Sequence, residues 1–482
     1  MLFNSIEFAV FLPLVFCVYW LVLKKNLMLQ NMFLLGASYV FYGWWDWQFL
    51  ILILLSTIVD FLIGIGLDKY KEKVKRKSLL LTSIVVNIGI LFIFKYYGFF
   101  VNNFVEAFRF FGAELNVRSL NIVLPVGISF YTFQTLSYSI DVYRKKLEPT
   151  RNFISFAAFV SFFPQLVAGP IERASNLLPQ FYKNRVFNYD QCVDGLRQIL
   201  WGLFKKVVIA DNCAEYVNLV FQNYELYNGS SLVIGAFFFS IQIYCDFSGY
   251  SDIAIGTSKL FGFTLMRNFS YPYFSRDIAE FWRRWHISLS TWFRDYVYIP
   301  LGGSKGGLYK KIRNTFIIFL VSGFWHGANW TFIVWGGLNA LYFLPLLLSN
   351  RNRLNLGVAA EGKHFPSLKE GVSILTTFGL TTLAWVYFRS DSVLDANGYL
   401  VRIFSSSIFS KPESLGLRHA LITPGLIVFM LIAEWWGREK EHPLTHLESK
   451  FNVVVRYTLY YGMILAMFLL SGEKQGFIYF QF

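Results

Sequence analysis

The sequence predicts an all-α, multi-pass integral membrane protein, and three observations support this prediction. Hydrophobic residues make up 55% of the 482-residue chain and charged residues only 15%, whereas a soluble domain carries about 25% charged residues. Aromatic residues reach 20%, with 53 Phe, as expected for surfaces that face lipid or the membrane interface. The length accommodates about ten to twelve membrane crossings of about 20 residues each, with their connecting loops.

The formal net charge of +14 is concentrated in short loops between apolar runs, which argues against a nucleic-acid partner. Six Lys and Arg residues lie within the nine residues Lys69–Lys77, and others lie in Arg144–Arg151, Ser304–Arg313 and Arg351–Arg353. Short basic loops are retained on the cytoplasmic side of a membrane. The charge pattern therefore predicts membrane topology, with the lipid bilayer as the surrounding partner.

The first apolar run is expected to be a retained span rather than a cleaved signal peptide. It begins with Glu7 and no basic residue, and Lys24-Lys25 follows it, which predicts an N-terminus outside the cytoplasm. With that start, three successive basic loops fall on one side. We expect crossings over residues 5–23, 28–45, 47–67, 78–98 and 121–142, and an amphipathic helix on the outer surface over Val101–Asn116.

After residue 150 the apolar runs become irregular. Pro164, Gly169-Pro170 and Glu172-Arg173 interrupt them, and such breaks at membrane depth require surrounding protein or a water-filled cavity. No repeat or hydrophilic linker divides the chain. The sequence therefore predicts one membrane domain over residues 1–482, with broken or re-entrant helices and a functional region at about 120–340.

His326 is the strongest candidate for a functional residue. It lies in Asn314–Asn350, a stretch of 37 residues without Lys, Arg, Asp or Glu. As one helix that stretch would be about 55 Å long, against a hydrocarbon core of about 30 Å, so it must tilt, break or cross twice. A histidine that deep by default marks function. On a helix it shares a polar strip with Ser322 and Asn329. A histidine that only cross-links two helices remains an equal alternative.

His286 is a second candidate, within Arg276–Leu301. If this segment is one helix, its aromatic and apolar residues form a single face and His286 lies on the opposite flank. A helix of this kind suits the cytoplasmic interface, where a histidine without any role remains an alternative.

Two aspartates lie in an apolar context, and the chain shows no metal motif. Asp246 and Asp252 could relay protons or orient a histidine, although pairing with an arginine is the more ordinary expectation. The four cysteines and the six histidines show no metal-ligand spacing. His442 and His446 lie in a charged loop, where we expect them to be solvated. No bound metal or cofactor is therefore predicted.

A buried neutral imidazole suits general-base catalysis, because it can take the proton of a sugar hydroxyl as that hydroxyl attacks. The same histidine could serve a proton-coupled exporter of a surface polymer, with His326, Asp246 and Asp252 as the relay. The residue pattern alone leaves both open.

Five ordered motifs give the chain a resemblance to the membrane-bound O-acyltransferase family, in its bacterial branch of alginate O-acetylases. The resemblance extends over nearly the whole chain, including the opening MLFNSIEFAVFL and the closing residues. The motifs are Phe163–Arg173 (FPQLVAGPIER), Asp246–Gly256 (DFSGYSDIAIG), Arg267–Pro272 (RNFSYP), Phe281–Gly303 (FWRRWHISLSTWFRDYVYIPLGG) and Gly323–Trp330 (GFWHGANW).

The resemblance implies a catalytic histidine at His326 and an assisting one at His286. It also implies a ring of helices around a thinned core and acetyl transfer to an extracytoplasmic polysaccharide. The donor it implies is acetyl-CoA or another acyl thioester, and a separate SGNH-hydrolase-like protein usually takes part. Sister branches act on peptidoglycan, cellulose or teichoic acid, so the acceptor stays open.

We therefore expect an O-acetyltransferase of the bacterial cytoplasmic (inner) membrane. His326 would act as base on the attacking hydroxyl, or on a residue that relays the acetyl group, and His286 would position or polarise the donor. The basic loop Ser304–Arg313 could meet donor phosphates. The exporter and a non-catalytic membrane scaffold are the alternatives.

Overall fold

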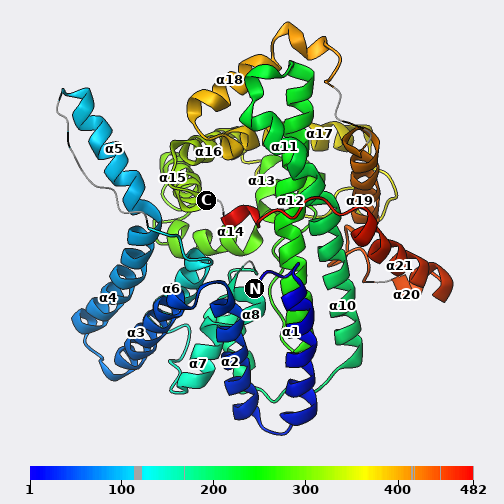
Figure 1. Ribbon diagram of the computed structural model, residues 1–482. Coiled ribbons are helices and arrows are strands. Elements are labelled where there is room, and N and C mark those ends of the chain that lie inside the picture. Colours follow the sequence, from blue (N-terminus) through cyan, green and yellow to red (C-terminus); the bar gives the residue numbers. More distant parts are fainter. Residues whose placement is uncertain are drawn as a thin grey trace. The chain divides into compact units, whose positions relative to one another are not determined.

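A computed structural model describes residues 1–112, 115, 122–167, 169–413, 416, 418–445 and 447–480. Every regular element in these ranges is a helix (Figure 1). The prediction of an all-α protein is therefore confirmed. The chain divides into two compact units, which we call unit 1 (Met1–Cys192 with Thr257–Met266) and unit 2 (Val193–Gly256 with Arg267–Phe482). The predicted organisation as a single domain stays a prediction.

Unit 1 is formed by the helices of the first 192 residues and the last turn of α12. Its elements are α1 (Ile6–Cys17), η1 (Val18–Val22), α2 (Leu27–Asp46), η2 (Trp47–Phe49), α3 (Leu50–Lys69), α4 (Lys73–Leu91), η3 (Phe92–Tyr96), α5 (Tyr97–Phe110), α6 (Ile128–Tyr143), α7 (Phe153–Val160), α8 (Phe163–Leu166), α9 (Ala174–Leu177) and η4 (Leu178–Tyr182).

Unit 2 contains the remaining helices. They are most of α10 (Tyr189–Leu203), η5 (Phe204–Ala210), α11 (Asp211–Gln222), η6 (Tyr224–Leu226), α12 (Gly229–Leu260), η7 (Pro272–Phe274), α13 (Ile278–Arg284), α14 (Ile287–Phe293), η8 (Arg294–Tyr298), α15 (Leu308–His326), α16 (Trp330–Leu348), α17 (Leu368–Arg389), α18 (Val393–Ile403), η9 (Ser406–Phe409), η10 (Arg418–Ile422), α19 (Thr423–Gly437), α20 (Leu447–Lys450), α21 (Val453–Leu469) and η11 (Ile478–Phe480).

The helices have the length and composition of membrane crossings. Six helical segments are long and apolar enough to span a bilayer, and three shorter apolar helices accompany them in the described residues. One of the six, Leu27–Lys69, contains two helices of 20 residues, α2 and α3, and each is about 30 Å long. The protein is thus a multi-pass membrane protein. The count of ten to twelve crossings stays a prediction.

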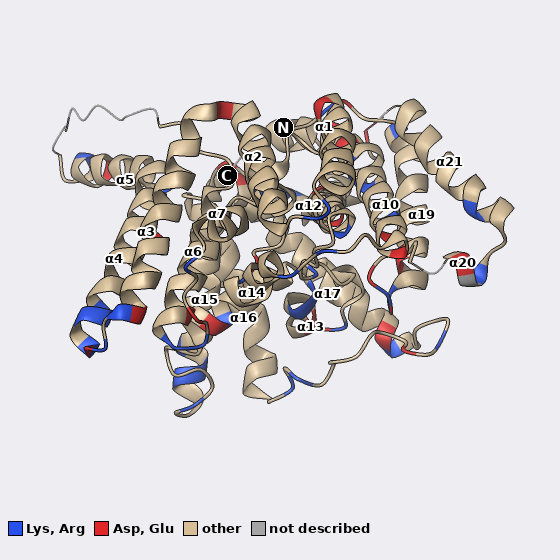
Figure 2. Ribbon diagram, turned by 90° about the horizontal axis from the view of Figure 1, so that it is seen from below, with Lys and Arg blue, Asp and Glu red and all other residues tan. Residues whose placement is uncertain are grey.

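Two of the predicted basic loops adjoin in unit 1. The guanidinium of Arg76 donates to the carbonyl oxygen of Tyr143 at 2.8 Å, and Arg151 pairs with Asp68 at 3.3 Å. Figure 2 shows the basic residues gathered at the shared end of α3 and α4. This proximity agrees with their prediction on one side of the membrane. α5 covers most of the predicted surface helix, but residues 113, 114 and 116 lie outside the described residues.

The long α12 is the enclosed helix of unit 2. In its most apolar window 83% of the residues are buried, against 28–39% in α16, α17 and the segment Arg418–Gly437. A helix buried on all sides can carry polar residues toward the interior, where neighbouring side chains satisfy them. Asp246, Ser251 and Asp252 lie on this helix and take part in the site described next.

Candidate active site

His326 is the last residue of α15, at the break predicted within the uncharged stretch. The helix ends because Gly327 adopts extended backbone (φ −161°, ψ 149°), and α16 begins three residues later. The two helices form a closely packed pair (Figure 1). His326 is only 3% exposed. Of the three arrangements expected for this stretch, the structure shows the break, with one helix on each side of it.

The predicted polar strip around His326 is correct for Ser322 and wrong for Asn329. Ser322 lies one turn before His326 on α15, and both are buried. Asn329 lies beyond the helix end and caps α16, where its side chain accepts from the backbone N–H of Thr331 at 3.1 Å. The strip assumed an unbroken helix, which the extended Gly327 ends.

Glycines allow α15 and α16 to approach closely. A side chain at Gly323 would clash with the carbonyl oxygen of Phe332, and one at Gly336 would clash with the carbonyl oxygen of Phe319. Small residues permit such close helix contact in membranes. The backbone of α15 at Gly323, one turn before His326, thus lies directly against α16.

His286 lies in a sharp turn between α13 and α14, so the prediction of one continuous helix over Arg276–Leu301 is wrong. Trp285 is extended, and His286 has left-handed backbone angles (φ 43°, ψ 55°). Left-handed backbone is rare for a residue with a Cβ and is often found at functional sites. The predicted apolar face is buried at Phe281, Trp285 and Leu289, yet His286 is also buried, at 1% exposure.

The structure brings the two histidines together. Their ring centroids are 6.4 Å apart. Aromatic rings surround the pair, with Trp335 at 5.2 Å and Phe388 at 5.4 Å from His326 and Phe247 at 4.7 Å from His286. Because a hydrogen bond spans about 3 Å, one small bound group can reach both imidazoles in an environment poor in water.

The segment after α21 also reaches the histidines, which sequence reasoning did not foresee. The ring of Tyr479 lies 5.6 Å from His326 and 6.3 Å from His286. The backbone N–H of Ile478 donates to the carboxylate of Asp246 at 2.7 Å. The Nζ of Lys206 donates to the carbonyl oxygen of Gln475 at 3.2 Å. These contacts hold an extended segment against α12 (Figure 1).

The two predicted aspartates pair with buried lysines rather than with arginines. Lys206 lies between Asp211 at 2.7 Å and Asp246 at 2.8 Å, and Lys205 contacts Asp252 at 2.7 Å. Both lysines lie on η5, in the apolar run WGLFKKVVIA, where two adjacent charges were the overlooked signal. The aspartates are therefore engaged in ion pairs and do not contact the histidines.

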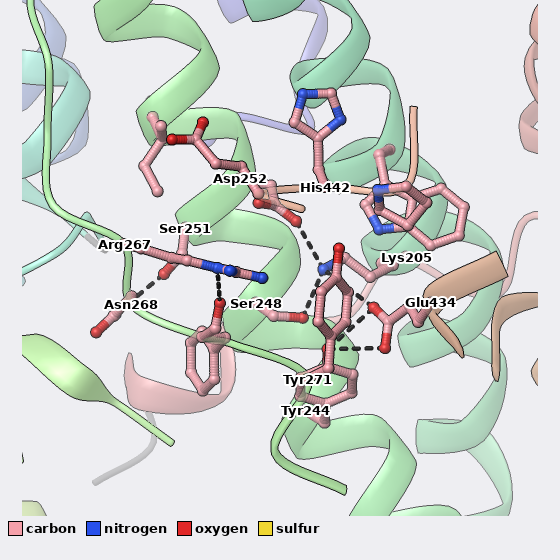
Figure 3. Close-up of a pocket in the computed structure, with 15 residues that line it drawn as sticks. Lys205, Tyr244, Ser248, Ser251, Asp252, Arg267, Asn268, Tyr271, Glu434 and His442 are labelled. Atoms are coloured by element: carbon pink, nitrogen blue, oxygen red, sulfur yellow. Dashed lines mark hydrogen bonds and ion pairs between the residues drawn. The ribbon is translucent and has the colours of Figure 1, made fainter. Parts of the chain in front are cut away.

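The ion pair of Lys205 borders a small polar cavity of about 20 Å³, which is room for about one water molecule. In Figure 3 Lys205 points toward Asp252, Ser248 and Glu434. Ser251 and Asn268 form the opposite edge and are joined by a hydrogen bond of 3.1 Å.

Two further predictions concern His442 and the basic loop Ser304–Arg313. His442 was expected to be solvated, but it is 1% exposed and its Nε2 lies 3.0 Å from the carboxylate of Asp194. That expectation is wrong for His442, and His446 lies outside the described residues. The basic loop is exposed at Lys305 and Lys310, and its contact with donor phosphates stays a prediction. The described residues contain no cluster of His, Cys, Asp or Glu suited to a metal ion.

Comparison with known proteins gives consistent matches over most of the chain. The model of the membrane-bound O-acyltransferase family matches residues 34–353. The "Probable alginate O-acetylase AlgI" of Pseudomonas aeruginosa is 40% identical over 416 residues, which cover 86% of this chain and 76% of the relative. The peptidoglycan O-acetyltransferase of Helicobacter pylori is 35% identical over 82% of this chain and 78% of its own length. The teichoic acid D-alanyltransferase of Streptococcus thermophilus is 30% identical over 55% of this chain and 68% of its own length.

Proposed function

Because the chain belongs to the membrane-bound O-acyltransferase family, we propose that it transfers acetyl groups to hydroxyls of an extracytoplasmic polysaccharide, with His326 and His286 as its catalytic residues. The observation that supports this most is the pair of buried imidazoles 6.4 Å apart. The two histidines lie 40 residues apart in the chain, in two different motifs. Each lies at a break between helices.

His326 acts as the general base. Its neutral imidazole takes the proton of the attacking hydroxyl as that oxygen bonds to the carbonyl carbon of the acetyl thioester. The carbon–sulfur bond then breaks, the proton passes to the thiolate, and the products are an ester and a free thiol. His286, whose ring lies 6.4 Å from that of His326, assists by holding or polarising the donor.

The hydroxyl that His326 deprotonates belongs either to the polysaccharide or to a protein residue that carries the acetyl group in between. Tyr479 supports the second route, because its phenol ring lies against both imidazoles. Replacing Tyr479 by Phe separates the two routes. Direct transfer needs only the ring, whereas relayed transfer needs the hydroxyl.

The resemblance to the family and the charge pattern lead to further parts of the proposal. The donor is acetyl-CoA or another acyl thioester, which meets the protein from the cytoplasm, beside its basic loops. The chain resides in the bacterial cytoplasmic membrane with its N-terminus outside. A separate SGNH-hydrolase-like protein then completes transfer to the polysaccharide. Alginate and peptidoglycan are acceptor classes named for the relatives.

The test is the acetyl content of the surface polysaccharide in cells that produce His326→Ala or His326→Gln at wild-type protein levels. General-base catalysis contributes about 10²–10⁴-fold, so acetylation should fall to background in both variants while the amount of polymer is unchanged. Full acetylation in both would contradict the assignment. A change in polymer amount at constant acetyl content would instead indicate an exporter.

A further inference from the structure

Asn268 contacts the turn that carries His286 through both its backbone and its side chain. Its backbone carbonyl oxygen accepts the N–H of Ile287 at 2.9 Å. Its side-chain Oδ1 lies 3.0 Å from Nδ1 of His286 and accepts from the hydroxyl of Ser288 at 2.9 Å. Asn268 has no exposed surface. One buried residue therefore holds the left-handed turn, and its side chain holds the imidazole.

The contacts of Asn268 determine which way its amide points. The backbone N–H of Ser288 can only donate, and it lies 3.4 Å from the same side-chain atom, so that atom is the amide oxygen. The amide nitrogen then faces the other way and donates to Ser251 Oγ at 3.1 Å, at the edge of the polar cavity (Figure 3).

This orientation fixes the tautomer of His286. An amide oxygen accepts and cannot donate, so Nδ1 of the imidazole must carry the hydrogen that joins them. In a neutral ring the other nitrogen, Nε2, then has no hydrogen and presents a lone pair. Burial among aromatic rings favours the neutral ring, because it penalises the charged form.

The lone pair of His286 remains available to a substrate. Nε2 is buried and has no hydrogen-bond partner among the described residues. A buried acceptor without a partner is uncommon in folded proteins and calls for an explanation, such as a catalytic role. The ring of His326 lies 6.4 Å away, so a group bound between the two can use this lone pair.

We propose that Asn268 is a positioning residue that locks His286 in its Nδ1–H tautomer, so that Nε2 accepts a hydrogen bond from the bound donor. This rests on the proposed function. It also chooses between the two forms of assistance given above. A neutral Nε2 without hydrogen cannot polarise the donor carbonyl, so His286 holds the donor beside His326 by accepting a hydrogen bond from one of the donor's N–H or O–H groups.

Two substitutions at Asn268 test the lock. Asn268→Leu has similar size but no acceptor, so the tautomers interconvert and acetyl transfer should fall about 10–100-fold, as for other residues that orient a working histidine. Asn268→Asp retains an acceptor and should keep activity within a few-fold. Its carboxylate also stabilises the imidazolium, so the acidic limb of the pH–activity profile should move to higher pH. Permeabilised cells supplied with acetyl-CoA provide the profile.

Asn314→Leu is the matched control. Asn314 is equally buried in unit 2, and its amide nitrogen donates to carbonyl oxygens such as that of Gly303 at 2.9 Å. The Asn314→Leu variant should keep the pH–activity profile of the wild type. Nitrogen NMR of histidine-labelled protein, with the His286 signal assigned from His286→Ala, reads the tautomer directly. We expect protonated Nδ1 in the wild type and Asn268→Asp, and a mixture in Asn268→Leu.

The outcomes separate this proposal from the proposed function. If His286→Ala is inactive while both Asn268 variants keep the wild-type activity, profile and tautomer, the lock is wrong and the histidine pair stands. If His286→Ala is fully active, the assignment of His286 fails, whatever the tautomer. If Asn268→Leu does not accumulate, the profile and the NMR signal of Asn268→Asp decide.

Discussion

The polar network around Asp60 in unit 1 and the histidine pair in unit 2 both keep ionisable side chains away from water, but they do so differently. Asp60 lies inside α3 and accepts from Asn87 of α4 at 2.7 Å and from Ser139 of α6 at 2.6 Å. These contacts satisfy the carboxylate on regular helices. His286 and His326 lie at helix breaks, among aromatic rings.

Buried polar groups that stabilise the fold can therefore be distinguished from buried polar groups that serve the reaction by their hydrogen-bond partners. A buried polar group surrounded by hydroxyl and amide partners joins helices, because each partner would otherwise be unsatisfied. The Nε2 of His286, which is buried and has no hydrogen-bond partner among the described residues, contributes no such bond to the fold. We therefore expect changes near Asp60 to affect stability, and changes at the histidines to affect activity.

The largest effect on stability is expected for replacement of Lys206. This buried lysine pairs with two carboxylates and also contacts the segment that carries Tyr479. Lys206→Met leaves the carboxylates of Asp211 and Asp246 without their cation, and breaking a buried pair costs about 3–5 kcal/mol in the free energy of unfolding. It also releases the carbonyl of Gln475. Trypsin should then cut at Lys474 faster than in the wild type.

Lys205→Met is the matched control for that experiment. Lys205 is equally buried and ion-paired, yet its contacts are with Ser248, Asp252 and Glu434. It should destabilise the protein without faster cleavage at Lys474. Equal cleavage rates in the two variants would show that Lys206 does not hold the segment that carries Tyr479.

An intermediate effect is expected where α15 and α16 meet. In Gly336→Ala the new methyl group meets the carbonyl oxygen of Phe319, whereas in Gly337→Ala it meets only Leu320 at 3.8 Å. Overpacking costs about 1–3 kcal/mol, so the melting temperature in detergent should fall for Gly336→Ala and stay unchanged for Gly337→Ala. Similar melting of both variants would argue against the close helix contact beside His326.

The smallest effect is expected for Asp60→Asn. The amide oxygen still accepts from Ser83 and Ser139, and only the bond with Asn87 is lost, at about 0.6 kcal/mol for a hydrogen bond between membrane helices. Acetyl transfer per folded protein should equal that of the wild type. Strongly reduced acetyl transfer at normal stability would show that the Asp60 network serves the reaction, and would contradict its assignment as a purely structural network.

Much of the fold could be predicted from the sequence because the membrane restricts the choices. Apolar runs of about 20 residues separated by basic loops specify helices and their ends. The break near His326 was predicted because 37 uncharged residues exceed one crossing. The turn at His286 was not, because helical periodicity continues through Arg276–Leu301 and tertiary contacts to Asn268 impose the left-handed residue.

The candidate site was only partly predictable for the same reason. Both histidines stand out as ionisable residues in apolar motifs. Asn268, Lys206 and Tyr479 acquire their importance from contacts over long distances in the chain, such as the 232 residues that separate Asp246 from Ile478. Spacing on one helix cannot show such contacts. Asn329 was misplaced because a helical wheel cannot detect the extended Gly327.

The most direct test of His326 as the catalytic base compares acetyl transfer per amount of folded protein in His326→Gln and Asp60→Asn. We expect that His326→Gln melts like the wild type and has lost acetyl transfer, whereas Asp60→Asn melts slightly lower and transfers acetyl groups normally. Normal transfer by folded His326→Gln would contradict the claim that this histidine is the catalytic base.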